Sequence, residues 1–244
     1  MSLTTVILLF VMVFFAAFVQ TLSGFGFALV VMPLVTFAVG LHMAAPLVAL
    51  AGLTLYAVNL ARYHRRLNFG ELARLAGASA LGIPVGVWAL IHVDESVIKA
   101  ALGVTLIAYA AYELARPSAM RLRGTRWAYL AGFAAGCLGG AYNTPGPPVV
   151  VYGALRQWAR DEFRAVLQAL FFINAMLTVT VHFVTRHLTA PVWIFYASIL
   201  PALLLGTAAG SRADSRVDKK HFRVLVSVMI AVLGVSLGLN AVWG

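Results

Sequence analysis

Long apolar runs separated by short polar stretches make up most of the chain. Eight such runs can be delimited by their polar interruptions: 4–40, 43–61, 69–91, 96–115, 127–155, 163–184, 190–210 and 222–243. Most have the roughly 20 residues that an α-helix needs to cross a hydrocarbon core about 30 Å thick. The pattern therefore predicts an all-α polytopic membrane protein.

The first and fifth runs are longer than one crossing requires. At ~1.5 Å per residue, an unbroken helix over 4–40 would exceed ~50 Å. Each run contains a polar stretch rich in glycine or proline, residues that weaken helix continuity. The two stretches are Gln20-Thr21-Leu22-Ser23-Gly24-Phe25-Gly26 and Gly139-Gly140-Ala141-Tyr142-Asn143-Thr144-Pro145-Gly146-Pro147-Pro148. We expect two half-helices joined by a polar tip in each run, as a re-entrant hairpin or as a kinked single crossing.

An internal repeat relates the two halves of the chain. A shift of 124 positions places Gly82 on Gly206, Gly86 on Gly210, Val93-Asp94 on Val217-Asp218 and Lys99 on Arg223, and a shift of 120 places Gly26 on Gly146. The repeat predicts two units, 1–120 and 121–244, each with a broken segment followed by three transmembrane helices. The Gly-x-x-x-Gly pairs are typical of helices that pack closely in membranes.

Composition and charge support a location in the membrane. Hydrophobic residues make up 62% of the 244 and charged residues 11%, which excludes an ordinary soluble domain. Lys and Arg outnumber Asp and Glu by 18 to 8. The basic residues cluster in loops, so they indicate membrane orientation rather than affinity for nucleic acid. The loops at 62–74, 116–126, 156–164 and 212–223 are therefore predicted to be cytoplasmic.

The flanks of the fifth run suggest how the halves are oriented. Arg126 and Arg156 bracket the run, so both of its ends are predicted to be cytoplasmic. By the repeat, the first run would enter and leave on the outer face. The two halves would then be inverted, as in many secondary transporters. Eight simple crossings with parallel halves remain the alternative, although they would leave Arg156, Arg160 and Arg164 on the outer face.

The two polar tips are the candidate binding site. Broken helix is tolerated in hydrocarbon only where it is buried in protein or lines a cavity. If the tips approach each other, the half-helices that start at Phe27 and Pro147 point their free N–H groups at a shared point suited to an anion. The alternative is that the tips are tight turns whose side chains only cap the half-helices. The candidate residues are Gln20, Thr21, Ser23, Gly24, Phe25, Gly26, Asn143, Thr144, Pro145, Gly146 and Pro147.

The other polar residues limit the kinds of substrate and activity that we expect. The eight acidic residues lie at or near segment ends, which disfavours a cation carrier. Asn59 and Asn174 could face the cavity or a neighbouring helix, and His182 could relay a proton or lie at the membrane interface. Ser23 and His182 lack the neighbours that a nucleophile and its base need, so we do not expect an enzyme. The single Cys137 offers no disulfide or thiolate site, and we expect neither cofactor nor metal.

Two strings of residues resemble the duplicated signature of the sulfite exporter TauE/SafE family. The first string runs from Phe18 to Phe27 and is followed by Met32-Pro33-Leu34. The second runs from Gly132 to Gly140 and is followed by Thr144-Pro145-Gly146-Pro147-Pro148-Val149-Val150. The resemblance covers essentially the whole chain and implies a transporter, often an exporter, of sulfite, sulfonates and related small organosulfur anions. Phe25 and Thr144-Pro145 depart from the more uniform glycines of the family, so another carboxylate or inorganic anion stays open as the substrate.

The expected partners follow from this interpretation. They are a small anionic substrate and the lipid bilayer, without nucleic acid, and self-association into a homo-oligomer is left open. We expect an integral protein of the bacterial inner membrane. The chain has no basic residue before Arg62, so a cleaved signal peptide is not expected.

Overall fold

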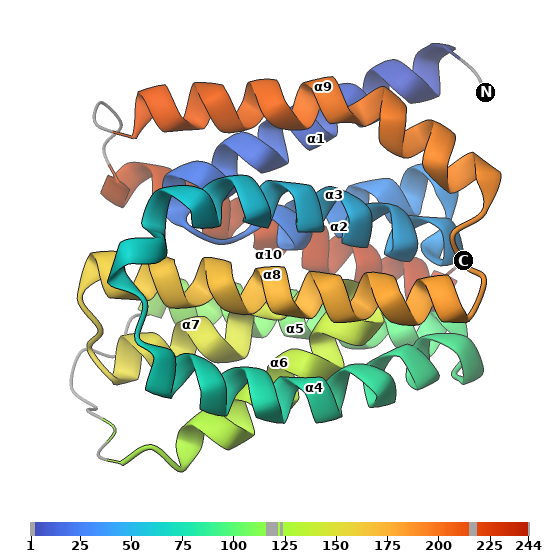
Figure 1. The fold of residues 1–244 in the computed structure, drawn as a ribbon. Coiled ribbons are helices and arrows are strands. Elements are labelled where there is room, and N and C mark those ends of the chain that lie inside the picture. Colours follow the sequence, from blue (N-terminus) through green and yellow to red (C-terminus); the bar gives the residue numbers. More distant parts are fainter. Residues whose placement is uncertain (1–2, 116–121, 123, 215–218, 244) are drawn as a thin grey trace.

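The structure is a computed structural model that describes residues 3–115, 122, 124–214 and 219–243. Almost all of these residues are helical, which confirms the all-α fold class (Figure 1). The helices are α1 (Leu3–Ser23), α2 (Phe27–Val39), α3 (Leu41–Tyr63), η1 (His64–Arg66), α4 (Phe69–His92), α5 (Glu95–Ala115), α6 (Trp127–Tyr142), α7 (Gly146–Leu155), α8 (Arg160–Val184), α9 (Ala190–Ala213) and α10 (Lys219–Trp243).

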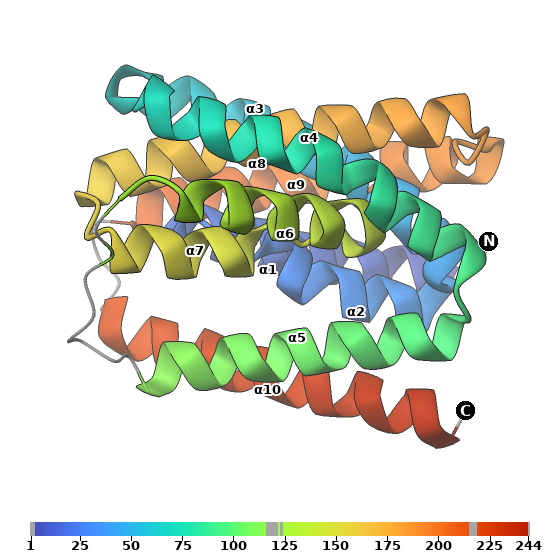
Figure 2. The same cartoon turned by 90° about the horizontal axis from the view of Figure 1, so that it is seen from below.

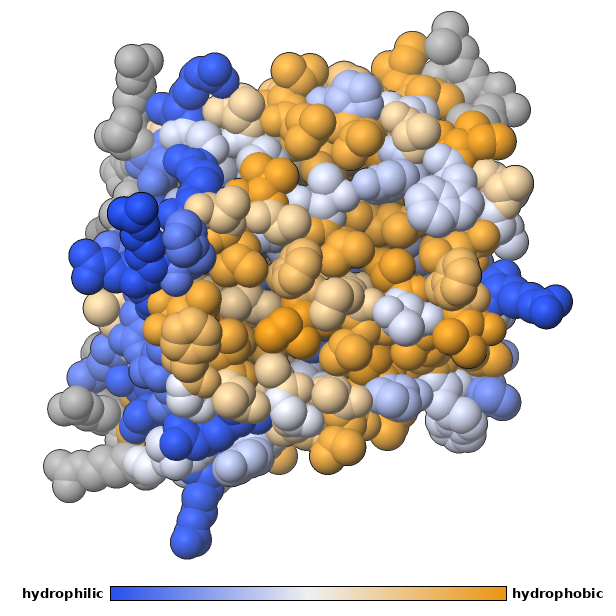
Figure 3. Space-filling model, in the orientation of Figure 1, coloured by the Kyte–Doolittle hydropathy of each residue, from blue (hydrophilic) through white to orange (hydrophobic). Residues whose placement is uncertain are grey.

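Five described segments are long and apolar enough to cross a membrane. They are Val6–Ser23, Leu41–Arg66, Phe69–His92, Asp161–Val184 and Ala190–Ala213. Figure 3 shows apolar side chains over the middle of the molecule and hydrophilic ones gathered at the end where α3 ends and α8 begins. This distribution is the one expected of a protein embedded in a bilayer with one strongly basic end.

Both long runs double back on themselves as hairpins. The residues between α1 and α2 are 24–26, and those between α6 and α7 are 143–145. In both ribbon views α2 returns to the end of the molecule where α1 begins, and α7 returns to the end where α6 begins (Figures 1 and 2). The two hairpins enter from opposite ends. A re-entrant hairpin is thus the form that each run takes.

Glycines bring the first arm of each hairpin close to a long helix. On α4, a Cβ added at Gly82 or Gly86 would overlap the carbonyl oxygen of Phe133 or Cys137 in α6. On α9, Gly206 faces the carbonyl of Phe14 in α1 in the same way. Such backbone contact is the result expected of small-residue spacing in membrane helices. The division into 1–120 and 121–244 stays a prediction, and its boundary lies outside the described residues.

Helices α3 and α8 pack against each other and connect the two halves. Helix α3 also contacts α9 and follows α2 in the chain, while α8 contacts α4 and follows α7. The second arms, α2 and α7, contact α3 and α8 respectively. The tip of each hairpin therefore lies near α3 and α8. This pair of helices positions the candidate site.

Because α4 and α6 approach so closely, we expect a substitution at their contact to lower the stability of the protein. Gly82→Ala should destabilise the protein by about 1–3 kcal/mol, because overpacking forces the two backbones apart. Gly77→Ala is the matched control, since it makes the same change in α4 at a site where the new Cβ meets nothing within 4 Å. Thermal unfolding in detergent should give a lower Tm for Gly82→Ala than for the control. Equal Tm values would contradict the packing.

Candidate functional site

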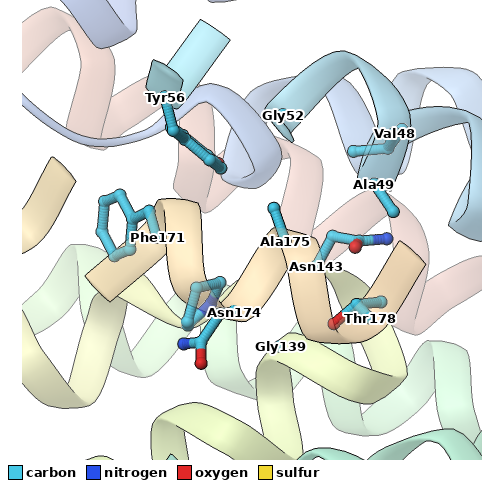
Figure 4. A pocket seen from close by; sticks show the side chains of 11 residues that line it. Val48, Ala49, Gly52, Tyr56, Gly139, Asn143, Phe171, Asn174, Ala175 and Thr178 are labelled. Atoms are coloured by element: carbon cyan, nitrogen blue, oxygen red, sulfur yellow. The ribbon is translucent and has the colours of Figure 1, made fainter. Parts of the chain in front are cut away.

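A narrow cavity lies inside the bundle beside the second tip (Figure 4). Its walls come from α3, α8 and the end of α6 with the following turn. Most lining residues are small or apolar, and none of those described carries a charge. The polar lining residues are Tyr56, Asn143, Asn174 and Thr178.

Asn174 brings an unpartnered hydrogen-bond donor to this cavity. The residue is only 1% exposed. Its Oδ1 accepts a hydrogen bond of 2.6 Å from Ser79 Oγ of α4, while its Nδ2 has no partner. A Cβ added at Gly139 would lie 3.9 Å from this Nδ2 and 3.5 Å from Pro145 Cβ, so the bare glycine leaves room beside the amide. A buried donor without a partner costs about 1–3 kcal/mol, which a ligand oxygen could offset.

Asn143 holds the second tip in place. It ends α6 with a φ of 56°, a left-handed conformation that asparagine tolerates better than most residues. Its side-chain Nδ2 donates to the carbonyl of Ala45 in α3 over 2.7 Å. The hydroxyl of the neighbouring Thr144 is buried without a partner. The tip is therefore fixed to α3 by one amide, with a second polar group left unused.

The start of α7 offers fewer donors than we expected. Helix α7 begins at Gly146, and prolines occupy the next two positions, 147 and 148, where they have no N–H to present. The backbone of Gly146 is not left-handed, and an added Cβ would make only an ordinary contact of 3.5 Å with Phe171. The second tip thus resembles the first in sequence position but not in backbone geometry.

The first tip satisfies its own polar groups. Gln20 Oε1 accepts from the backbone N–H of Phe27 over 2.9 Å, and so caps α2. Thr21 and Ser23 donate to carbonyls of their own helix, Ala17 and Val19, over 2.8 and 2.7 Å. These contacts match the alternative in which a tip is a capped turn. The structure therefore brings Asn143, Pro145 and Asn174 to the cavity, and none of the first-tip residues lines it.

Glycine and aromatic residues shape the first tip. Gly24 and Gly26 have φ values of 87° and 109°, which other residues adopt only with strain. The Phe25 ring packs edge-on against Tyr109 at 5.8 Å between centroids. The Phe27 ring contacts Tyr56 of the cavity wall at 6.4 Å. This aromatic contact links the start of α2 to the cavity wall.

Two residues of α8 that the sequence analysis did not select fasten the first tip. Gln168 Nε2 donates to the Gly24 carbonyl over 2.7 Å. Arg164 is only 6% exposed, donates to the Leu22 carbonyl over 2.7 Å and pairs with Asp214 at 3.0 Å. The guanidinium thus holds the carbonyl end of α1 while Asp214 balances its charge.

A buried polar stripe along α8 could have revealed these residues. Positions 164 and 168, and positions 174, 178 and 182, repeat at steps of four within an apolar run, which places each set on one helix face. Polar residues inside membrane helices face the protein interior. All five are buried. The spacing therefore indicated α8, which carries more buried polar residues than any other helix in the described part of the chain.

The remaining candidates lie outside the cavity. Asn59 is 1% exposed, and both of its amide atoms lack partners. His182 is fully buried in the protein, with its Nδ1 3.3 Å from Nδ1 of His187. Glu71 is a buried carboxylate, but it is bound by Arg156 at 3.0 Å and by the Tyr152 hydroxyl at 2.8 Å. Its charge is thus neutralised away from the cavity.

Two helical hairpins that enter an apolar bundle from opposite ends are an arrangement typical of membrane transporters. The comparison with family models agrees, since residues 9–237 match the model described as sulfite exporter TauE/SafE. The chain belongs to this family of membrane transporters. No curated protein and no solved structure matches the chain.

Gly26 and Gly146 differ in backbone conformation, so we expect the same substitution to affect them differently. Gly26→Ala should destabilise the protein by about 1 kcal/mol or more, because its φ of 109° is strained for any residue with a Cβ. Gly146→Ala should have little effect, because the new methyl group makes only an ordinary contact. Denaturant or thermal unfolding in detergent would measure both. Equal losses in the two variants would show that the tips have the same backbone requirement.

Proposed function

We propose that the protein exports a small organosulfur anion, such as sulfite or a sulfonate, and that the anion binds beside the second tip. The cavity there has room for about one water molecule, so the proposal includes a widening between α3 and α8 when the anion binds. The observation that carries the proposal is the buried, unpartnered Nδ2 of Asn174 in a cavity whose described lining has no charged group. A free donor without a nearby carboxylate favours an anion and offers nothing to a cation.

Neutral donors suit a transported anion. A sulfonate spreads its charge over three oxygens, one of which can accept from Asn174 Nδ2, and the cavity lining also includes Thr178 and Tyr56, which carry hydroxyl groups. Each neutral hydrogen bond contributes about 0.5–1.5 kcal/mol. A few such bonds hold the anion without trapping it, whereas a buried arginine would bind it more tightly. The family supports the organosulfur class, and the cavity supports the sign of the charge.

We infer the orientation of the protein in the membrane from the basic end of the molecule. Loops rich in arginine resist translocation, so we place the end where α3 ends and α8 begins in the cytoplasm. At this end Arg164 and Asp214 fasten the first tip. At the other end the second tip is fastened by the neutral bond from Asn143 to Ala45. Release of either contact would let its hairpin move relative to α8 or α3, a relative motion of the kind that alternating access requires.

Flux through proteoliposomes tests the proposal. Ethanesulfonate and sulfite should each move by a saturable, protein-dependent route, and each should inhibit the other. Dimethyl sulfone is the matched control, because it is small and carries sulfonyl oxygens without a charge. It should neither move nor compete. Flux that follows a cation and is indifferent to the anion supplied would contradict the proposal.

A cavity-filling variant tests the site. Gly139→Ala places a methyl group beside Asn174 Nδ2 at ordinary contact distances, so the fold should keep its Tm. The Kd for ethanesulfonate should rise about 2- to 10-fold, the value of roughly one neutral hydrogen bond. Gly77→Ala makes the same change in an open position of α4 and should leave the Kd unchanged. The same Kd in both variants would place the anion elsewhere.

A further inference from the structure

Asn59 is the one buried amide side chain among the described residues that has no hydrogen-bond partner at either end. The residue is 1% exposed, and neither its Oδ1 nor its Nδ2 is bonded. The other buried side-chain amides of the described chain each have at least one partner; they are Gln20, Asn143, Gln168 and Asn174. An amide without partners costs free energy in a protein interior, and polar groups inside membrane helices are commonly functional. Asn59 therefore has a property that packing alone does not explain.

The face of α3 that carries Asn59 is turned toward α8. Tyr56, Asn59 and Tyr63 follow one another at steps of three and four residues, so they share one face of the helix. The Tyr56 ring lies 5.3 Å from the ring of Phe171 in α8, measured between centroids (Figure 4). The Tyr63 hydroxyl accepts from Arg164 Nη1 in α8 over 3.3 Å. Asn59 therefore faces α8 between these two contacts.

Along this interface Asn59 lies between the cavity and the basic end of the bundle. Three residues separate it from Tyr56 of the cavity wall, or ~4.5 Å along the helix axis. Four residues further on, Tyr63 meets Arg164, which pairs with Asp214 at 3.0 Å. We place this end of the molecule in the cytoplasm. The order from the cytoplasm inward is thus an ion pair, an amide without partners and then the cavity.

We propose that Asn59 is a second binding station for the transported organosulfur anion, on the route between the cytoplasmic end and the cavity. This inference rests on the proposed function. Since no partner fixes the amide at either end, it can turn its NH₂ group toward an oxyanion whichever way it rests. The hydrogen bond then offsets part of the cost of moving a charge between two packed helices.

The aromatic rings of Tyr56 and Phe171 keep the two stations apart. Both residues line the cavity and contact each other, whereas Asn59 does not line it. The anion would pass from Asn59 to the cavity when α3 and α8 part during transport. An anion that crosses the membrane in either direction therefore meets Asn59, while an anion bound at equilibrium occupies the cavity.

Separate measurements of rate and affinity test the proposal, with ethanesulfonate as the probe. Asn59→Leu removes both polar atoms with little change in volume, so the protein should keep or raise its Tm. The maximal rate of ethanesulfonate uptake into proteoliposomes should fall about 2- to 10-fold, the range for one neutral hydrogen bond. The Kd in detergent should stay unchanged, because Asn59 does not line the cavity.

Thr36→Val is the matched control. The Thr36 hydroxyl is also buried without a partner, but it lies in the last turn of α2, at the far end of that helix from the first tip. Its removal should change neither the rate nor the Kd. Asn59→Ala, which cannot overpack the site, should repeat the loss of rate seen with Asn59→Leu.

The outcomes distinguish a station from a packing residue. A wild-type rate in either folded Asn59 variant would overturn the proposal. A higher Kd with an unchanged maximal rate would also overturn it, because Asn59 would then belong to the cavity site. An equal loss of rate in Thr36→Val would overturn it as well. Wild-type protein that neither binds nor moves ethanesulfonate would instead overturn the proposed function, and the role of Asn59 would fall with it.

Discussion

Backbone polar groups in a membrane must find partners within the protein, and this constraint governs both hairpins. A tip interrupts the helix and so frees N–H and C=O groups where water is scarce. The first tip meets the requirement with Gln20, which caps α2, and with Gln168 and Arg164, which bind the Gly24 and Leu22 carbonyls. The second tip meets part of it with prolines, which have no N–H to satisfy. The two tips therefore satisfy their backbone polar groups with different residues.

The two tips differ in how many of their polar groups lack a hydrogen-bond partner. The first tip's side chains are engaged in capping and in bonds to their own helix, so that tip is suited to a structural role. Beside the second tip, the Thr144 hydroxyl and Nδ2 of Asn174 remain without partners. A buried group left unpaired costs free energy, and this cost is tolerated most readily where a ligand removes it. The asymmetry is why we place the anion at the second tip alone.

The sequence predicted the fold better than the site. Glycine and proline near 24–26 and 139–148 located both breaks, and the arginines at 126 and 156 indicated that the fifth run doubles back. These are local signals. The capping of α2 by Gln20 depends on how the chain turns, and the engagement of Arg164 depends on Asp214, 50 residues away in the chain. Asn174 was a candidate from its place within an apolar helix, but its partner Ser79 follows from the packing of α4 and α8, which no spacing in the sequence specifies.

The location of a bound anion tests the central claim most directly. A crystal structure with bromomethanesulfonate would locate the bromine by anomalous scattering and the sulfonate oxygens by density. We predict that the sulfonate lies between α3 and α8, with an oxygen within hydrogen-bond distance of Asn174 Nδ2. A sulfonate bound instead at the first tip, against Gln20 and the start of α2, would contradict the account.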